Sequence, residues 1–180
     1  MNRFIIADPK KCIGCRTCEI ACVIAHNENQ ELSGLNTASF APRLHVIKSV
    51  NVSTAVLCRQ CEDAPCANVC PNGAIIRTDD RVLVKQEHCI GCKTCVVACP
   101  YGAMEVITRP VTRQNETVMN LPTEKAEAHK CDLCFGRDNG PACMEVCPTN
   151  ALYCVDRNML QEMNAAKRRR AALDTLSSLF

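Results

Sequence analysis

Cysteine is the residue type with the clearest chemistry in this chain, which has seventeen cysteines among 180 residues. Residues 89–100 read CIGCKTCVVACP, a C-x2-C-x2-C-x3-C-P run whose cysteines are Cys89, Cys92, Cys95 and Cys99. Three thiolates at this spacing lie on one tight loop, and Gly91 can take the positive φ that brings the backbone close to a bound group. The spacing is typical of [4Fe–4S] cluster ligands, and the fourth cysteine often ligates a second cluster, so the run predicts a partner motif.

Three more motifs of four cysteines supply possible partners. Residues 12–22 repeat the spacing of the first run, residues 58–71 widen its middle gap to four residues, and residues 131–148 widen it to eight. In chain order, their cysteines are Cys12, Cys15, Cys18 and Cys22; Cys58, Cys61, Cys66 and Cys70; and Cys131, Cys134, Cys143 and Cys147. Sixteen of the seventeen cysteines thus belong to four motifs, which predicts four [4Fe–4S] clusters.

Structural zinc sites are the alternative use of so many thiols, because they also contain paired C-x2-C segments. Proline follows the last cysteine of three motifs, and two motifs have consecutive two-residue gaps that end in a three-residue gap. Both features belong to cluster motifs and favour iron over zinc. Cys154 lies outside the motifs, in the apolar segment ALYCV. We interpret it as a small buried residue; a reactive thiol or an alternative ligand is the other interpretation.

A second pattern, CP-x-[GN]-A-apolar, follows three of the motifs. It begins at Cys70, Cys99 and Cys147, and its small residues are Ala74, Ala103 and Ala151. Each copy predicts a turn, a small residue packed near a cluster, and then a short strand. The repetition indicates an internally duplicated arrangement.

The composition narrows the class of protein. Only six residues are aromatic, so a small apolar core would depend on bound metal for its stability, and we expect the metal-free chain to be largely unfolded. The formal net charge is +2. Each cluster with four thiolates would add about −2, which disfavours a nucleic-acid partner. The segment MNRFIIADPK offers no signal-peptide core, and no apolar run is long enough to span a membrane, so we expect a cytoplasmic location.

The segments between the motifs predict an α+β fold with short strands. Strand patterns occupy 3–8, 43–50 and 54–57, and IIRTDDRVLVK after Ala74 predicts a hairpin. The polar segment 109–128 predicts a surface excursion. We divide the chain into ferredoxin-type motifs and a basic helical tail, with bounds 2–31, 49–79, 80–109, 122–155 and 156–180. The basic run at 167–170 in that tail is interpreted as a solvated helix face; the alternative is a docking tail for a partner subunit or an anionic surface.

Over residues 1–155 the four motifs, with the second widened and the fourth widened further, resemble the four-cluster electron-transfer subunits of molybdopterin oxidoreductases. These include the iron–sulfur subunits of dimethyl sulfoxide reductase, formate dehydrogenases and formate hydrogenlyase. The resemblance implies two ferredoxin-like lobes, formed by the first with the fourth motif and by the second with the third. Spacing alone also permits sequential pairing.

The resemblance also implies which cysteines share a cluster. The four expected sets are Cys12, Cys15, Cys18 and Cys147; Cys58, Cys61, Cys66 and Cys99; Cys89, Cys92, Cys95 and Cys70; and Cys131, Cys134, Cys143 and Cys22.

The function implied is the relay of single electrons, from a molybdopterin formate dehydrogenase towards a hydrogenase or another redox partner. An enzymatic role finds no support in the motifs, because the seven glycines form neither G-x-G-x-x-G nor a P-loop. Two alternatives stay open: a maturation or assembly factor for formate dehydrogenase or hydrogenase, and an iron–sulfur subunit held permanently in a larger enzyme.

Overall fold

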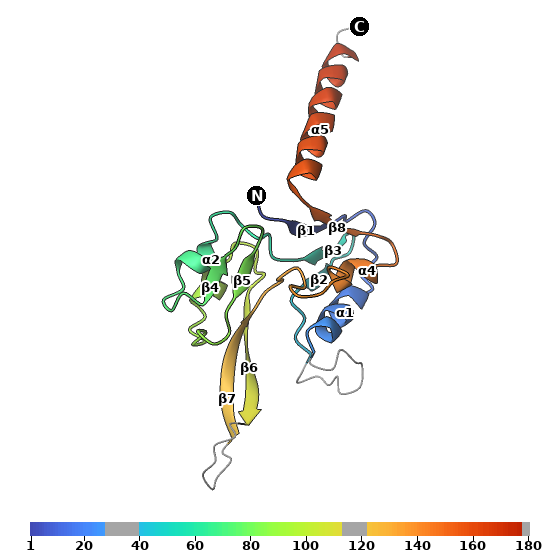
Figure 1. The fold of residues 1–180 in the computed structure, drawn as a ribbon. Helices are drawn as coiled ribbons and strands as arrows, with labels where there is room; N and C mark the ends of the chain where they lie inside the picture. The colour runs from blue at the N-terminus through green and yellow to red at the C-terminus, as the bar shows by residue number, and fades with distance from the viewer. Residues whose placement is uncertain (28–39, 113–121, 178–180) are drawn as a thin grey trace.

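The structure is a computed structural model, and it describes residues 1–27, 40–112 and 122–177. Within these ranges, eight strands form four separate two-stranded antiparallel sheets (Figure 1). The sheets pair β1 (Phe4–Ala7) with β8 (Leu152–Val155), β2 (His45–Lys48) with β3 (Ser53–Val56), β4 (Ile75–Arg77) with β5 (Val82–Val84), and β6 (Glu105–Thr112) with β7 (Pro122–His129). The helices are α1 (Thr17–Ala25), α2 (Pro65–Asn68), α3 (Thr94–Ala98), α4 (Ala142–Glu145) and α5 (Arg157–Ser177). The mixed helix and strand content agrees with the α+β expectation.

The β1–β8 sheet brings the start of the chain to the segment that follows the fourth motif. Its register pairs Phe4 with Val155 and Ala7 with Leu152, so that α1 of the first motif packs against α4 of the fourth. The short sheet elements predicted at 3–8, 43–50, 54–57 and after Ala74 are all present as β1, β2, β3 and the β4–β5 hairpin. Their short apolar runs are bounded by turns and cysteine loops, which fixes their length.

Buried apolar side chains form two separate clusters. One surrounds cysteines of the first and fourth motifs, and its other members are Ile5, Leu44, Val46, Ala55, Leu57, Leu133 and Leu152. The second surrounds cysteines of the second and third motifs, with Ala64, Ile75, Val82, Met104 and Ala128. Each of these two apolar clusters is small, so cysteine side chains make up a substantial part of the buried core.

Strands β6 and β7 form a long hairpin that includes the described parts of the segment 109–128, which the sequence predicted only as a surface excursion. The ribbon extends away from the body of the molecule (Figure 1). Its strands are mostly polar, and their pairing is supported by charges across the ribbon such as Arg109 on β6 and Glu127 on β7, whose Nε and Oε2 atoms lie 3.9 Å apart. Pro110 and Pro122 are compatible with strands because a two-stranded ribbon has two free edges.

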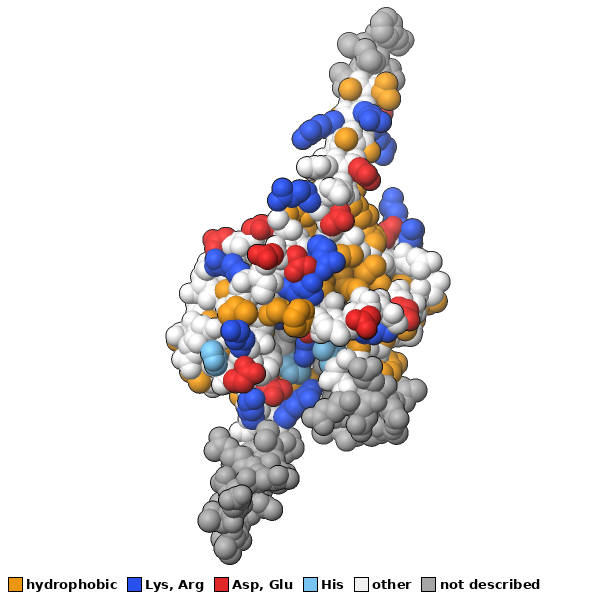
Figure 2. All heavy atoms as spheres, in the orientation of Figure 1, with side chains coloured by type: hydrophobic (Ala, Val, Ile, Leu, Met, Phe, Trp, Pro, Cys, Tyr) orange, Lys and Arg blue, Asp and Glu red, His pale blue; other side chains and the backbone are white. Residues whose placement is uncertain are grey.

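Helix α5 occupies the predicted helical tail and projects from the body (Figure 1). Asp156 caps its first turn, with Oδ1 accepting a hydrogen bond from the backbone N–H of Met159 at 2.8 Å. Side chains from Ala165 to Asp174 are exposed, and the basic run lies among them (Figure 2). Over the described residues, none of the helices is both long and apolar enough to cross a membrane.

Candidate iron–sulfur cluster sites

The structure gathers the motif cysteines into four sets of four. Three sets each line a cavity of their own: Cys12, Cys15, Cys18 and Cys147; Cys58, Cys61, Cys66 and Cys99; and Cys70, Cys89, Cys92 and Cys95. The remaining four are Cys22, Cys131, Cys134 and Cys143. The charge of Cys22 raises the pKa values of the other three, in addition to the larger effect of burial, so the four lie close together. Each set therefore combines three cysteines of one motif with the last cysteine of another.

The loops of the first and third motifs share one backbone conformation. Gly14 and Gly91 have φ values of 70° and 69°, in the left-handed region that favours glycine. A Cβ atom at Gly14 would lie 2.9 Å from Ser53 Oγ on β3, and one at Gly91 would overlap the Cβ atom of Ala126 on β7. Each cysteine loop is thus held against a β-hairpin, which leaves space for glycine alone.

The fourth cysteine of each motif accepts a hydrogen bond from a backbone N–H group. In the repeated CP-x-[GN]-A pattern the donor is the alanine, and the N–Sγ distances are 3.3 Å from Ala74 to Cys70, 3.4 Å from Ala103 to Cys99 and 3.3 Å from Ala151 to Cys147. In the first motif, which lacks this pattern, Arg43 N donates to Cys22 Sγ at 3.3 Å. These donors suit a negatively charged, metal-bound thiolate.

The turn in this pattern explains why its fourth position is glycine or asparagine. Gly73, Gly102 and Asn150 have φ values of 59°, 61° and 48°. Asparagine is among the few non-glycine residues that adopt the left-handed region readily. The positive φ reverses the chain so that the next N–H, that of alanine, faces the thiol.

The thiols differ in exposure and therefore in pKa. Burial raises the pKa of Cys18 to about 11 and that of Cys131 to about 12, because an apolar environment disfavours the thiolate. Cys15 and Cys92 are exposed, and the hydroxyls of Thr17 and Thr94, each 3.3 Å from the sulfur, lower their pKa values. The buried thiols would have to release protons when they ligate iron, which couples binding to proton release.

Polar contacts hold the loops around the cysteine sets. Asp132, next to Cys131, accepts hydrogen bonds from His26 Nε2 at 3.1 Å and from Arg43 Nη1. Burial opposes the charged forms of both groups, but the hydrogen bond raises the pKa of His26 to about 9 and lowers that of Asp132 to about 2. This ion pair ties the end of α1 to the fourth motif.

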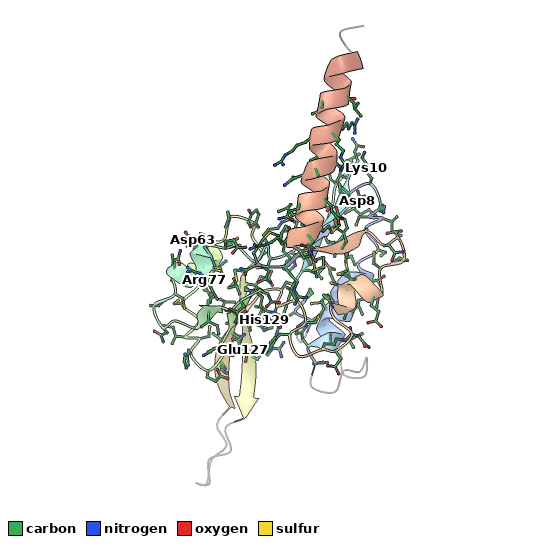
Figure 3. The ribbon with its side chains drawn as sticks, turned by 45° about the horizontal axis from the view of Figure 1, so that its top comes forward. Asp8, Lys10, Asp63, Arg77, Glu127 and His129 are labelled. Atoms are coloured by element: carbon green, nitrogen blue, oxygen red, sulfur yellow. The ribbon has the colours of Figure 1, made fainter. Side chains whose placement is uncertain are left out.

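Further contacts on the surface support the first and second motifs. Asp8 Oδ1 accepts a hydrogen bond from Lys10 N at 2.9 Å, which turns the chain into the first motif (Figure 3). Asp63 of the second motif lies 3.4 Å from Arg77 at the end of β4 (Figure 3). Both contacts are largely exposed and contribute little to stability.

Cys154 belongs to none of the four sets. It lies half-buried on β8, packs against the apolar cluster of the first and fourth motifs, and has a pKa raised by burial. Sequence reasoning missed the buried polar residues Gln60 and Lys130, which lie between the cysteine loops with exposed fractions of 1% and 2%. No local pattern distinguishes them from polar residues on a surface loop.

Comparison with known families defines the class of protein. The family described as "4Fe-4S dicluster domain" matches residues 52–157, and the one described as "4Fe-4S binding domain" matches residues 9–22. The first match covers more than half of the chain, so the chain belongs to the 4Fe-4S dicluster family and binds [4Fe–4S] clusters.

Relatives of known name agree with this assignment. Electron transport protein HydN of Escherichia coli (strain K12) is 67% identical over 96% of this chain and 99% of that protein. The putative electron transport protein YsaA of the same strain is 53% identical, over 89% of this chain and 94% of that protein. Formate hydrogenlyase subunit 2, also of Escherichia coli (strain K12), is 40% identical, over 93% of this chain and 89% of that protein. The resemblance to electron-transfer proteins inferred from the cysteine motifs is confirmed.

Proposed function

We propose that the protein is an electron carrier that holds four [4Fe–4S] clusters, each ligated by one of the four cysteine sets. The observation that carries the proposal is the exchange of the fourth ligand between motifs, since every set takes three cysteines from one motif and one from another. When bound, such clusters accept and release single electrons. The chain's own residues exclude water from the buried thiols and direct N–H groups at the fourth sulfur of each motif.

The two apolar clusters support an organisation in two ferredoxin-like lobes. One lobe would combine the first and fourth motifs (2–31 and 122–155), and the other would combine the second and third (49–79 and 80–109). Ile5 and Leu152 lie in the buried cluster of the first lobe, and Ile75 and Val82 in that of the second. Among the described residues, the buried cysteines of the first motif share a cluster with those of the fourth, and those of the second share one with the third, which supports this pairing over the sequential one.

Electrons would enter and leave near the two exposed cysteines. Cys15 and Cys92 occupy equivalent positions in the CIGC segments of the first and third motifs, and therefore lie in different proposed lobes. Beside them, Ile13 and Ile90 are 60% and 61% exposed. An exposed apolar side chain next to an exposed cysteine of a cluster site suits transient contact with a redox partner.

The partner proposed is a molybdopterin formate dehydrogenase, a hydrogenase, or a complex of the two. The similarity to formate hydrogenlyase subunit 2 and to the electron transport protein HydN supports a formate-linked role. In this role the chain carries electrons between enzymes and has no substrate site of its own.

The test is a reductive titration of anaerobically purified protein, monitored by electron paramagnetic resonance together with iron and zinc counts. The proposal predicts about sixteen irons per chain and several reducible, magnetically coupled clusters. Cys147→Ser should alter one cluster, whereas Cys154→Ala should leave the iron count unchanged. Zinc in place of iron, or clusters that do not reduce, would contradict the proposal.

A further inference from the structure

Lys130 is a buried cation at the contact between the second and fourth motifs. Its side chain is among the most deeply buried in the described structure, with 2% of the residue exposed. Its ammonium donates hydrogen bonds to the carbonyl oxygen of Cys131 at 2.8 Å and to Gln60 Oε1 at 3.3 Å. Both acceptors are neutral, so the positive charge has local hydrogen bonds but no local counter-charge.

Carboxylates do not supply that counter-charge. None of the ion pairs formed among residues 1–27, 40–112 and 122–177 includes Lys130. The nearby carboxylate of Asp132 is engaged by His26 and Arg43. A buried charge without a partner is strongly unfavourable, and such a residue normally points to a charge that compensates it.

Two cysteine sets surround the ammonium. Cys131, which follows it in the chain, belongs to one set, and Gln60 lies between Cys58 and Cys61 of another. Burial raises the pKa values of the thiols of Cys66 and Cys131, and the charge of Lys130 opposes that rise in both sets. Its field therefore reaches thiols on both sides of the contact.

Gln60 holds the ammonium in this position. Gln60 Oε1 accepts hydrogen bonds from Val82 N at 2.9 Å and from Lys130 Nζ, while its Nε2 donates to the carbonyl oxygen of Cys131 at 2.7 Å. Asn2 Nδ2 in turn donates to the backbone oxygen of Gln60 at 2.9 Å. Gln60 is thus a positioning residue, tied to three separate segments of the chain.

From this arrangement we propose that Lys130 is a shared counter-ion for the two clusters held by the second and fourth motifs, and that it raises the reduction potential of both. The inference rests on the proposed four-cluster function, in which each cluster with its thiolates carries about −2 charge. A fixed positive charge stabilises the reduced, more negative state of each cluster. Electrons then reside preferentially at the contact between the proposed lobes rather than at the clusters beside the exposed Cys15 and Cys92.

The expected size of the effect follows from Coulomb's law. With an effective dielectric constant near 20, one unit charge about 12 Å from a cluster changes the equilibrium constant for its one-electron reduction by about tenfold. Loss of the Lys130 charge should therefore lower the reduction equilibrium constants of two clusters by about tenfold or more, which corresponds to about 59 mV for one electron.

The experiment compares Lys130→Met, Lys130→Arg and Lys11→Met by potentiometric titration of the iron-loaded proteins, with each cluster followed by electron paramagnetic resonance. Lys11 is the matched control, because it also precedes a motif cysteine, Cys12, but is exposed. Two potentials should fall in Lys130→Met and two should stay unchanged. Lys130→Arg should keep all four near the wild-type values, and Lys11→Met should change none.

Three results would overturn the proposal: unchanged potentials in iron-replete Lys130→Met, an equal shift of all four clusters, or a Lys11→Met shift as large as that of Lys130→Met. If Lys130→Met does not retain its iron, Gln60→Glu makes the same test with the lysine in place. A carboxylate against Nζ should lower the same two potentials, and unchanged values would overturn the proposal. Wild-type protein without reducible clusters would instead contradict the proposed function itself.

Discussion

The side-chain amide of Gln60 reaches the carbonyl oxygen of Cys131 across 71 positions of sequence, with an Nε2–O distance of 2.7 Å. Gln60 lies inside the second motif, and Cys131 is the first cysteine of the fourth. The oxygen of the same amide accepts the N–H of Val82 at 2.9 Å, in strand β5. One buried side chain therefore connects two cysteine loops and a hairpin. Its substitution tests how far the stability of the fold depends on these connections.

Gln60→Leu should lower the free energy of unfolding by about 3 kcal/mol, because it leaves the Val82 N–H and the Cys131 carbonyl buried without this partner. The shift in the denaturant midpoint under anaerobic conditions measures the effect. Gln161→Leu, at an exposed position on α5, is the matched control and should change the midpoint little. Equal effects of the two substitutions would show that the hydrogen bonds of Gln60 do not stabilise the fold.

Gly91→Ala should reduce the iron bound per chain. The position combines a φ of 69° with a Cβ that would overlap Ala126, so alanine must distort the loop of the third motif. Gly102→Ala is the matched control, with a φ of 61° but open space around the Cβ position. The double variant Gly91→Ala, Ala126→Gly should recover part of the lost iron. Equal iron content in the two single variants would show that the close packing of Gly91 against Ala126 does not affect iron binding.

The chemistry of the site could be predicted from the sequence because it depends on short-range patterns. The spacing of the cysteines and the glycine or asparagine at residues 73, 102 and 150 belong to single turns, and the structure shows the turns that those residue types favour. The β6–β7 hairpin could not be predicted because the segment 109–128 is mostly polar, and the residues of β7 that pack against the body, Ala126 and Ala128, are small. Gln60 and Lys130 could not be predicted, because their burial arises only when segments about 70 positions apart pack together.

Ile13→Glu and Ile90→Glu should slow electron exchange with the redox partner without loss of iron. Both side chains are mostly exposed beside Cys15 and Cys92. A carboxylate there would have to lose its hydration when the partner binds, which weakens the contact. Stopped-flow reduction by a molybdopterin formate dehydrogenase measures the rate. Val50→Glu, 97% exposed between β2 and β3, controls for the added charge. If all three variants react at the wild-type rate, electron exchange occurs at another surface.

Asp80→Asn should destabilise the protein slightly at neutral pH. Hydrogen bonds from Arg81 and then Arg3 lower the pKa of Asp80 to about 2, from an ordinary value of 3.8. A depressed folded-state pKa contributes stability that is present above about pH 4 and is lost as the pH falls towards 2. Because the carboxylate is partly exposed, we expect less than about 1 kcal/mol.

Denaturation midpoints of wild type and Asp80→Asn check this dependence. The difference between them should be constant between about pH 5 and pH 8 and should narrow below about pH 4. A difference that grows as the pH falls would have the wrong sign for a stabilising carboxylate. Asp79→Asn, at the neighbouring position in the same turn, is the control, and its midpoint should follow that of wild type across the range.

Removal of residues 165–180 should leave the iron content, cluster potentials and denaturation midpoint unchanged. Helix α5 projects from the body, and among its side chains as described up to Asp174, the half-buried ones, at 159, 160, 163 and 164, lie before the cut. A longer deletion from Arg157 removes those contacts as well and should lower the midpoint. The shorter deletion also removes the basic run at 167–170, so it tests whether that run is a solvated helix face. If the shorter deletion leaves the rate of electron exchange at low ionic strength unchanged, that interpretation is supported. If the deletion slows electron exchange at low ionic strength but not at high ionic strength, the run is a docking contact.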